Sequence, residues 1–100
     1  MSAIFRDMTA DGLHASAENQ KRAFTSWLRP GETVSYSGLA AELNRISPAP
    51  DGVKYPYTRA ADRLVQKLRK AGMIELVKKE WQLTQDGAAL RAELLHEVSP

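Results

Sequence analysis

Residues 58–83 constrain the fold of this chain more than any other segment, because they combine a two-faced helix with a short hairpin. Apolar side chains recur between residues 58 and 71 at the 3.6-residue spacing of an α-helix. They gather on one side of a helical wheel: Ala61, Leu64, Val65, Leu68 and Ala71. Gly72 then ends the helix, and residues 73–83 have the pattern of two strands joined by a tight turn. The segment predicts a helix with an apolar back, followed directly by a β-hairpin.

The other side of this helix is basic, and so is the tip of the hairpin. The residues concerned are Arg59, Arg63, Gln66 and Lys70, with Lys67 at their flank, and Lys78 and Lys79 at the tip. Residues 54–80 hold eight Lys/Arg against three Asp/Glu, whereas residues 1–53 hold five against six and residues 81–100 one against three. The total charge of +2 therefore conceals a concentrated positive segment. Such local asymmetry indicates a polyanionic partner, and nucleic acid is the first expectation.

Length and composition fit one globular domain with a modest core, at 100 residues, 43% hydrophobic and 26% charged. No apolar run approaches the roughly 18 residues of a membrane span. The first eight residues carry charge where a signal peptide needs its apolar stretch. A cytoplasmic protein without a membrane partner is expected.

Catalytic chemistry has little support in the sequence. The absence of cysteine excludes disulfides, thiolate metal sites and cysteine nucleophiles. His14 and His96 are isolated, with no second ligand at metal-binding spacing. No glycine-rich phosphate loop and no nucleophile-elbow serine occurs. We expect neither an enzyme nor a cofactor, and no small-molecule ligand is evident.

The rest of the chain predicts three more helices and a break. A helix over residues 17–29 follows a Ser16 cap and stops at Pro30. A brief strand at 32–35 leads into a helix ending near Asn44, and Thr84 caps a last helix to about Val98. Residues 1–16 are expected to form a loose arm or a short extra helix, and residues 17–98 a single domain. Trp27 and Trp81 fall in apolar patterns and are expected in the core.

Three local stretches, at residues 33–43, 61–74 and 81–87, resemble the winged helix-turn-helix family of DNA-binding domains. The first looks like the strand and first helix of the turn, the second like the recognition helix entering the wing. The third is similar to the second wing strand passing into a C-terminal helix. The resemblance spans roughly residues 17–95. It implies a mainly α fold with about four helices and a two- or three-stranded wing sheet.

The resemblance also implies roles for the basic residues. The recognition helix, residues 58–71, would enter the major groove of double-stranded DNA, and the wing, residues 73–83, would touch the backbone or the minor groove. Base edges would be read by Arg59 and Arg63, and by Gln66 at adenine. Contacts to phosphates are expected from Thr58, Lys70, Lys78 and Lys79, and Lys67 is a further helix candidate. The implied function is sequence-specific or general DNA binding, most simply in a small transcription regulator.

One segment departs from the family pattern. Residues 45–57 replace a turn of about three or four residues with a longer, proline-rich loop. This loop either adds contacts to a partner through Lys54, Tyr55 and Tyr57, or shields the recognition helix. The two tyrosines are more simply interpreted as packing residues that anchor the loop.

Two further expectations concern partners. Winged-helix folds also bind proteins, so the alternative function is a protein-interaction module whose basic face and proline-rich loop bind an acidic protein. A homodimer through the terminal helices is also expected. The apolar residues of the last helix that would form its seam are Leu90, Leu94, Leu95 and Val98.

Overall fold

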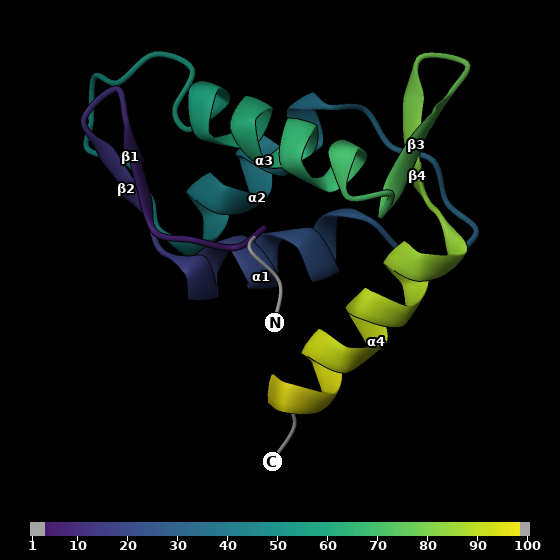
Figure 1. Cartoon of the computed structure of the whole chain (residues 1–100). Coiled ribbons are helices and arrows are strands. Elements are labelled where there is room, and N and C mark those ends of the chain that lie inside the picture. Colours follow the sequence, from purple (N-terminus) through teal and green to yellow (C-terminus); the bar gives the residue numbers. More distant parts are fainter. Residues whose placement is uncertain (1–3, 99–100) are drawn as a thin grey trace.

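The computed structural model describes residues 4–98, which form four helices and two small antiparallel hairpins (Figure 1). In chain order these elements are β1 (Met8–Ala10), β2 (Leu13–Ala15), α1 (Ala17–Trp27), α2 (Ser37–Ile46), α3 (Thr58–Lys70), β3 (Ile74–Val77), β4 (Glu80–Leu83) and α4 (Gln85–Val98). None of the helices in this described part combines the length and the apolar character that a membrane span requires.

The core lies where α1, α2 and α3 meet, and each helix contributes leucine or phenylalanine. The largest fully buried apolar side chains are Phe24, Leu28, Leu39, Leu43, Leu64, Leu68 and Val65. Burying one such side chain contributes roughly 1.5–3 kcal/mol, so these contacts hold α3 firmly in place. Trp27 and Trp81 are also buried, as predicted.

Side-chain caps fix the starts of two helices. The Ser16 hydroxyl accepts a hydrogen bond of 3.0 Å from the Asn19 backbone N–H, which confirms the predicted cap of α1. The Thr84 hydroxyl accepts from the Gly87 N–H at 3.0 Å and so begins α4 as predicted. Helices α1 and α4 thus begin where the sequence supplies an oxygen acceptor for a free N–H group.

The hairpin of β3 and β4 is joined by a third piece of chain. Val34 lies beside Trp81, and their backbones exchange two hydrogen bonds of 2.9 and 2.8 Å. The strand predicted at residues 32–35 is thus reduced to a single bridge, because only Val34 reaches β4. This bridge ties the segment between α1 and α2 to the hairpin after α3.

The N-terminal segment differs from the expectation of a loose arm or short helix, because residues 8–15 form the hairpin of β1 and β2. Ala10, Leu13 and Ala15 are buried while Thr9 and His14 are exposed, so side chains alternate between core and solvent. The buried Gln20 side chain holds this segment to α1 by donating to the Ala15 carbonyl at 2.9 Å. The same amide nitrogen also donates to the Arg6 carbonyl, which lies before β1.

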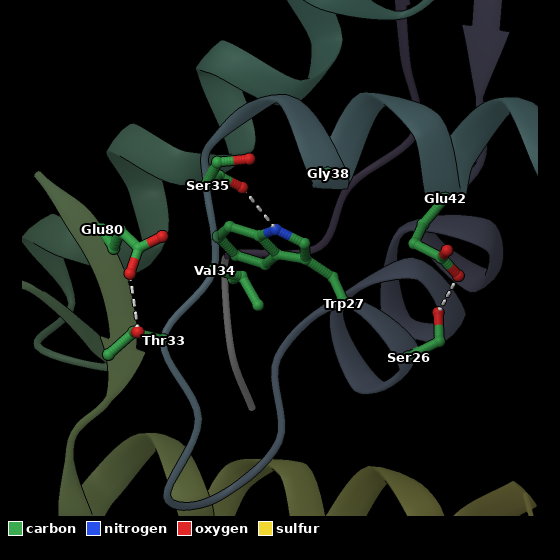
Figure 2. A pocket seen from close by; sticks show the side chains of 8 residues that line it. All are labelled: Ser26, Trp27, Thr33, Val34, Ser35, Gly38, Glu42 and Glu80. Carbon is green, nitrogen blue, oxygen red and sulfur yellow. Dashed lines mark hydrogen bonds between the residues drawn. The ribbon is translucent and has the colours of Figure 1, made fainter.

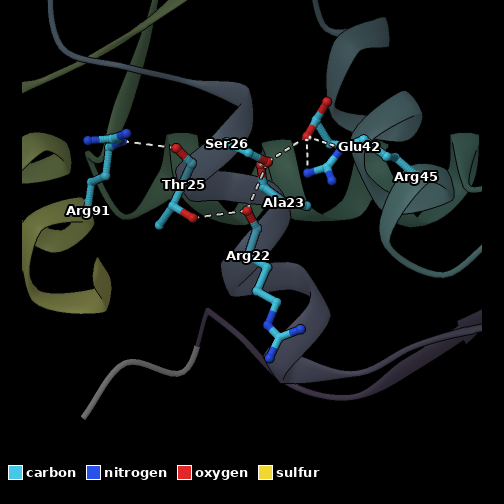
Figure 3. A network of polar contacts seen from close by, with 7 residues as sticks. All are labelled: Arg22, Ala23, Thr25, Ser26, Glu42, Arg45 and Arg91. Atoms are coloured by element: carbon cyan, nitrogen blue, oxygen red, sulfur yellow. Dashed lines mark hydrogen bonds and ion pairs between the residues drawn. The ribbon is translucent and has the colours of Figure 1, made fainter. Parts of the chain in front are cut away.

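Helix α4 lies at the edge of the three-helix core, on the α1 side and away from α3 (Figure 1). The Arg91 guanidinium donates to the Thr25 carbonyl at 3.0 Å, as Figure 3 shows. In the same figure, Glu42 of α2 accepts from Ser26 of α1 at 2.6 Å and pairs with Arg45 at 2.8 Å. Polar contacts therefore link α1 to both α2 and α4 around the edge of the core.

Candidate nucleic-acid interface

Helix α3 has one buried face and one exposed face, as its sequence predicts. The residues turned to the core are Ala60, Ala61, Leu64, Val65 and Leu68. Ala71 is exposed, contrary to its place in the predicted apolar stripe, because the helix has already ended at Lys70. Arg59, Arg63, Gln66 and Lys70 are all exposed, and Lys67 is half-buried at their flank. The predicted basic residues of this helix thus share a single exposed surface, which we call the outer face of α3.

Most cations near this face have no carboxylate partner. Arg59 alone among the predicted site residues forms an ion pair within residues 4–98, at 3.7 Å between its Nε and Asp11 Oδ2. Both side chains are more than half exposed, so the pair contributes little to stability and is readily broken. By contrast, Arg22 and Arg45 pair with glutamates of their own helices. Charge on the outer face is left available for an external anion.

Two predicted contacts are already engaged within the chain. The Gln66 Oε1 atom accepts from the Arg69 guanidinium at 3.3 and 3.4 Å, so pairing with adenine requires that contact to open. Arg69 was missing from the predicted site, although its position three residues after Gln66 places it on the same side of a helix. The Thr58 hydroxyl donates to the Tyr55 carbonyl at 2.8 Å, which occupies the proton that it was expected to give to a phosphate.

The tip of the β3–β4 hairpin has a conformation that the sequence did not predict. Lys78 and Lys79 form a two-residue turn between paired Val77 and Glu80, with φ angles of 49° and 69°. Turns with two positive φ values favour Asn-Gly or Asp-Gly, and the β1–β2 turn has that chemistry at Asp11 and Gly12. A lysine in the left-handed region costs roughly 1–2 kcal/mol. Two strained, exposed lysines therefore form the tip.

The loop of residues 47–57 is held by its own polar contacts. Tyr57 is 6% exposed, and its hydroxyl donates to the Ser47 carbonyl at 2.5 Å. This confirms the packing interpretation for Tyr57. For Tyr55 that interpretation is wrong, because its side chain is 83% exposed. Lys54 is exposed as well, and the outer face of α3 stays open, so the loop does not shield it.

No protein family, curated protein or solved structure was found to match the chain. The positions of the site residues therefore come from the geometry above. Three groups of predicted residues occupy one continuous stretch of chain: the exposed residues of the loop, the outer face of α3 and the hairpin tip.

The predicted dimer seam is only partly exposed. Leu94 is 4% exposed and belongs to the core of the single chain, which removes it from any seam. Leu90 is half-buried against the same core, and Leu95 is 40% exposed. The side chain of Val98 lies outside the described residues. Helix α4 docks one side on α1, which explains why two of these leucines are used internally.

A hollow of about 390 Å³ lies outside the basic surface, at the edge between α1, α2 and β4 (Figure 2). Its lining residues are Ser26, Trp27, Thr33, Val34, Ser35, Gly38, Glu42 and Glu80. Its polar groups are paired: the Trp27 indole donates to the Ser35 carbonyl at 3.0 Å, and Thr33 donates to Glu80 at 2.8 Å. Hydrogen bonds from Arg45 and then Ser26 lower the pKa of Glu42. Within residues 4–98 no three His, Cys, Asp or Glu side chains gather to hold a metal ion.

Proposed function

We propose that the chain is a winged helix-turn-helix domain that binds double-stranded DNA. Helix α3 serves as its recognition helix, and the β3–β4 hairpin as its wing. The order of elements supports this assignment: α1, the Val34 segment, α2, α3 and the hairpin follow one another. The Val34–Trp81 bridge adds a third piece of chain beside β4, as a three-stranded wing sheet requires.

The outer face of α3 is the observation that carries the proposal. Its exposed cations are unpaired apart from the weak Arg59–Asp11 contact within the described residues, while the opposite face is buried. A helix of 13 residues is about 20 Å long and roughly 10–12 Å across, which suits a major groove roughly 12 Å wide. Unpaired lysines and arginines on such a helix can neutralise DNA phosphates, and the counterions that were bound to those phosphates are released.

The roles of the side chains follow from their chemistry and position. Arg59 and Arg63 lie in the first two turns of α3, and each guanidinium can bind O6 and N7 of guanine together. Lys67 and Lys70 suit phosphates, because an ammonium is a compact charge on a flexible stem. The lysines of the wing tip suit the neighbouring backbone. Sequence-specific binding of this kind suits a small transcription regulator.

A homodimer belongs to the same proposal. One short helix and one wing make few contacts, whereas specific affinities for operators are about 10⁻⁸ M or tighter. Leu95 is an exposed apolar residue of the predicted seam, so its side chain can contact a second copy of the chain. Sedimentation of wild type and Leu95→Glu tests this part of the proposal, since a dimer through α4 should dissociate in the variant.

Titration of a labelled random-sequence duplex at 50 and 200 mM salt tests DNA binding directly. On a duplex that wild type selects from random sequences, Arg63→Ala should weaken binding by roughly 5- to 150-fold, equivalent to the loss of one base-reading side chain. Arg22→Ala is the matched control: it also removes one exposed arginine, but from α1, where Arg22 pairs with Glu18. Arg22→Ala should lower the affinity for DNA only by the small amount expected when one positive charge is removed away from the binding surface.

The absence of binding by wild type at 50 mM salt would overturn the proposal. The basic face would then be assigned to an acidic protein surface, the alternative that the sequence left open. Competition distinguishes the two partners: unrelated duplex DNA should displace a ligand from the basic face if that face binds DNA, and should leave a complex with an acidic protein intact if it does not.

A further inference from the structure

The loop of residues 47–57 stands at the end of α3 opposite the wing. We infer that it is a second DNA-contacting element, in which Tyr55 and Lys54 bind the sugar–phosphate strand on that side. This inference rests on the proposed function. It assigns Lys54 and Tyr55, two of the exposed residues of the loop, to the strand that the wing does not reach.

The loop has a fixed shape, because both of its ends are tied down. At the α2 end, Asn44 Oδ1 accepts from the Ala49 N–H at 2.9 Å. At the α3 end, Tyr57 is buried and its hydroxyl reaches back to the Ser47 carbonyl. These contacts close the loop on itself, so Tyr57 is a positioning residue rather than a contact residue. A fixed loop presents its exposed side chains without first having to be ordered.

Tyr55 combines full exposure with an unfavourable backbone. Its φ angle is 52°, a region that costs an L-residue roughly 1–2 kcal/mol, and 83% of the residue is exposed. Within residues 4–98 its side chain makes no hydrogen bond or aromatic contact that would offset this strain. Gly52, three residues earlier, has a positive φ at no such cost. The Tyr55 carbonyl accepts from Thr58, but the side chain has no such partner in the described part of the chain, and a strained residue with an unengaged side chain is typical of a site that serves binding.

The arrangement around α3 explains which strand is involved. Figure 1 shows the loop and the β3–β4 tip rising beyond α3 at its two ends, on the side away from α1 and α4. We place α3 obliquely in the groove, so that the two ends of a helix about 20 Å long approach the opposite strands that border a major groove roughly 12 Å wide. Lys78 and Lys79 approach one strand, and Lys54 and Tyr55 approach the other.

The chemistry of the two side chains suits the backbone rather than the bases. A phenol hydroxyl donates to phosphate oxygens, as tyrosines commonly do in DNA complexes, and the ring can pack on deoxyribose. The Lys54 ammonium adds a charge contact. Since every nucleotide has the same sugar and phosphate, the loop should strengthen binding to all duplexes equally.

Tyr55→Asn is the informative variant, because asparagine tolerates a positive φ but lacks the ring and the phenol. Binding to a duplex selected by wild type, and to a random duplex, should both weaken by about tenfold, as expected for one hydrogen bond to a charged group. Tyr55→Phe keeps the ring and should lose less. The melting temperature of Tyr55→Asn should stay equal to that of wild type or rise, because strain is removed.

Hydroxyl-radical footprinting on the selected duplex gives a readout that a structural role would not change. Tyr55→Asn and Lys54→Ala should each lose protection of sugars on one strand at one flank, and Lys78→Gln/Lys79→Gln should lose it on the other strand. Unchanged affinity and footprint for Tyr55→Asn, with Arg63→Ala still defective, would overturn this inference and leave the proposed function standing. Failure of wild type to bind any duplex would overturn both.

Discussion

The turn at the tip of the β3–β4 hairpin gives a prediction in which stability and the proposed DNA binding change in opposite directions. Lys78 and Lys79 have φ angles of 49° and 69°, and each L-residue in this region costs roughly 1–2 kcal/mol. Asparagine tolerates the region and glycine enters it freely, although glycine loses about 0.5–1 kcal/mol through greater freedom of the unfolded chain. The double substitution Lys78→Asn/Lys79→Gly should therefore raise the free energy of unfolding by about 1 kcal/mol.

That gain should be visible as a rise in Tm of about 4–8 °C for a chain of this size. The same substitution removes two exposed cations, and each phosphate contact contributes about 0.9 to the slope of log K against log salt for duplex DNA. The slope should fall by about 1.8, with weaker binding to every sequence. Thermal melts followed by circular dichroism measure the first effect, and fluorescence anisotropy at four or more salt concentrations measures the second.

Two control variants separate strain from charge. Lys78→Gln/Lys79→Gln removes both charges but leaves side chains in the left-handed region, so binding should weaken without a higher Tm. Gly12→Lys places a lysine at φ 77° in the β1–β2 turn, where a Cβ atom meets nothing within 4 Å, and should lower stability by about 0.5–1 kcal/mol after the lost freedom of glycine is counted. If Lys78→Asn/Lys79→Gly has the same Tm and the same salt slope as wild type, both the strain at the turn and its contact with phosphates are refuted.

Two further predictions concern stability. Gly87→Ala should destabilise the fold by roughly 3 kcal/mol, at the upper end for overpacking. The added Cβ atom would lie 1.8 Å from the Met73 carbonyl oxygen and force α4 to shift. Urea unfolding measures this loss. Hydrogen bonds from Arg45 and then Ser26 lower the pKa of Glu42 from 4.5. The ionised carboxylate therefore stabilises the fold above pH 4.5, and this contribution is lost as the pH falls through the lowered pKa of the folded state. The difference in stability between wild type and Glu42→Gln should therefore be present at pH 7 and shrink as the pH falls below 4.5, measured by urea unfolding across this range.

Each of these predictions has an outcome that would contradict it. The exposed substitution Ala89→Ser in the same helix should change stability by less than about 0.5 kcal/mol, so equal losses in Ala89→Ser and Gly87→Ala would argue against a clash at Met73. A Glu42→Gln difference that stays constant from neutral to acid pH would argue against a stabilising carboxylate.

Sequence reasoning succeeded for α3 because a 13-residue helix displays several turns of its period. Leu64 and Leu68 differ from Arg63 and Lys70 strongly enough in polarity for the two faces to be assigned without knowing the partner surface. The caps at Ser16 and Thr84 were predictable for a similar reason, since a short polar side chain at a helix start satisfies N–H groups locally.

The N-terminal hairpin was missed because its strands have three residues each. An alternation over three residues cannot be distinguished from scattered apolar side chains. Asp11 and Gly12 were the available signal, since this pair suits a two-residue turn. The contact between Asp11 and Arg59 could not be foreseen, because it joins segments whose packing depends on the whole core.

Backbone conformation explains the remaining misses at the site. Local preference argues against a left-handed lysine or tyrosine, so nothing in the residue types indicated the φ angles at Lys78, Lys79 and Tyr55. The opposite burial of Tyr55 and Tyr57, two residues apart, depends on that conformation. Irregular loops lack the periodicity that separates faces in helices.

The Val34–Trp81 bridge has a consequence for the order of the β3–β4 hairpin. Two backbone hydrogen bonds attach the hairpin to a segment 47 residues earlier in the chain, and the Trp81 side chain is buried in the core. The hairpin is therefore part of the same cooperative unit as the helices, and its loss would uncover the core. In the proposed DNA complex the hairpin is ordered before binding, so little conformational entropy is lost on association. The on-rate for DNA should accordingly be set by diffusion and charge rather than by folding of the hairpin.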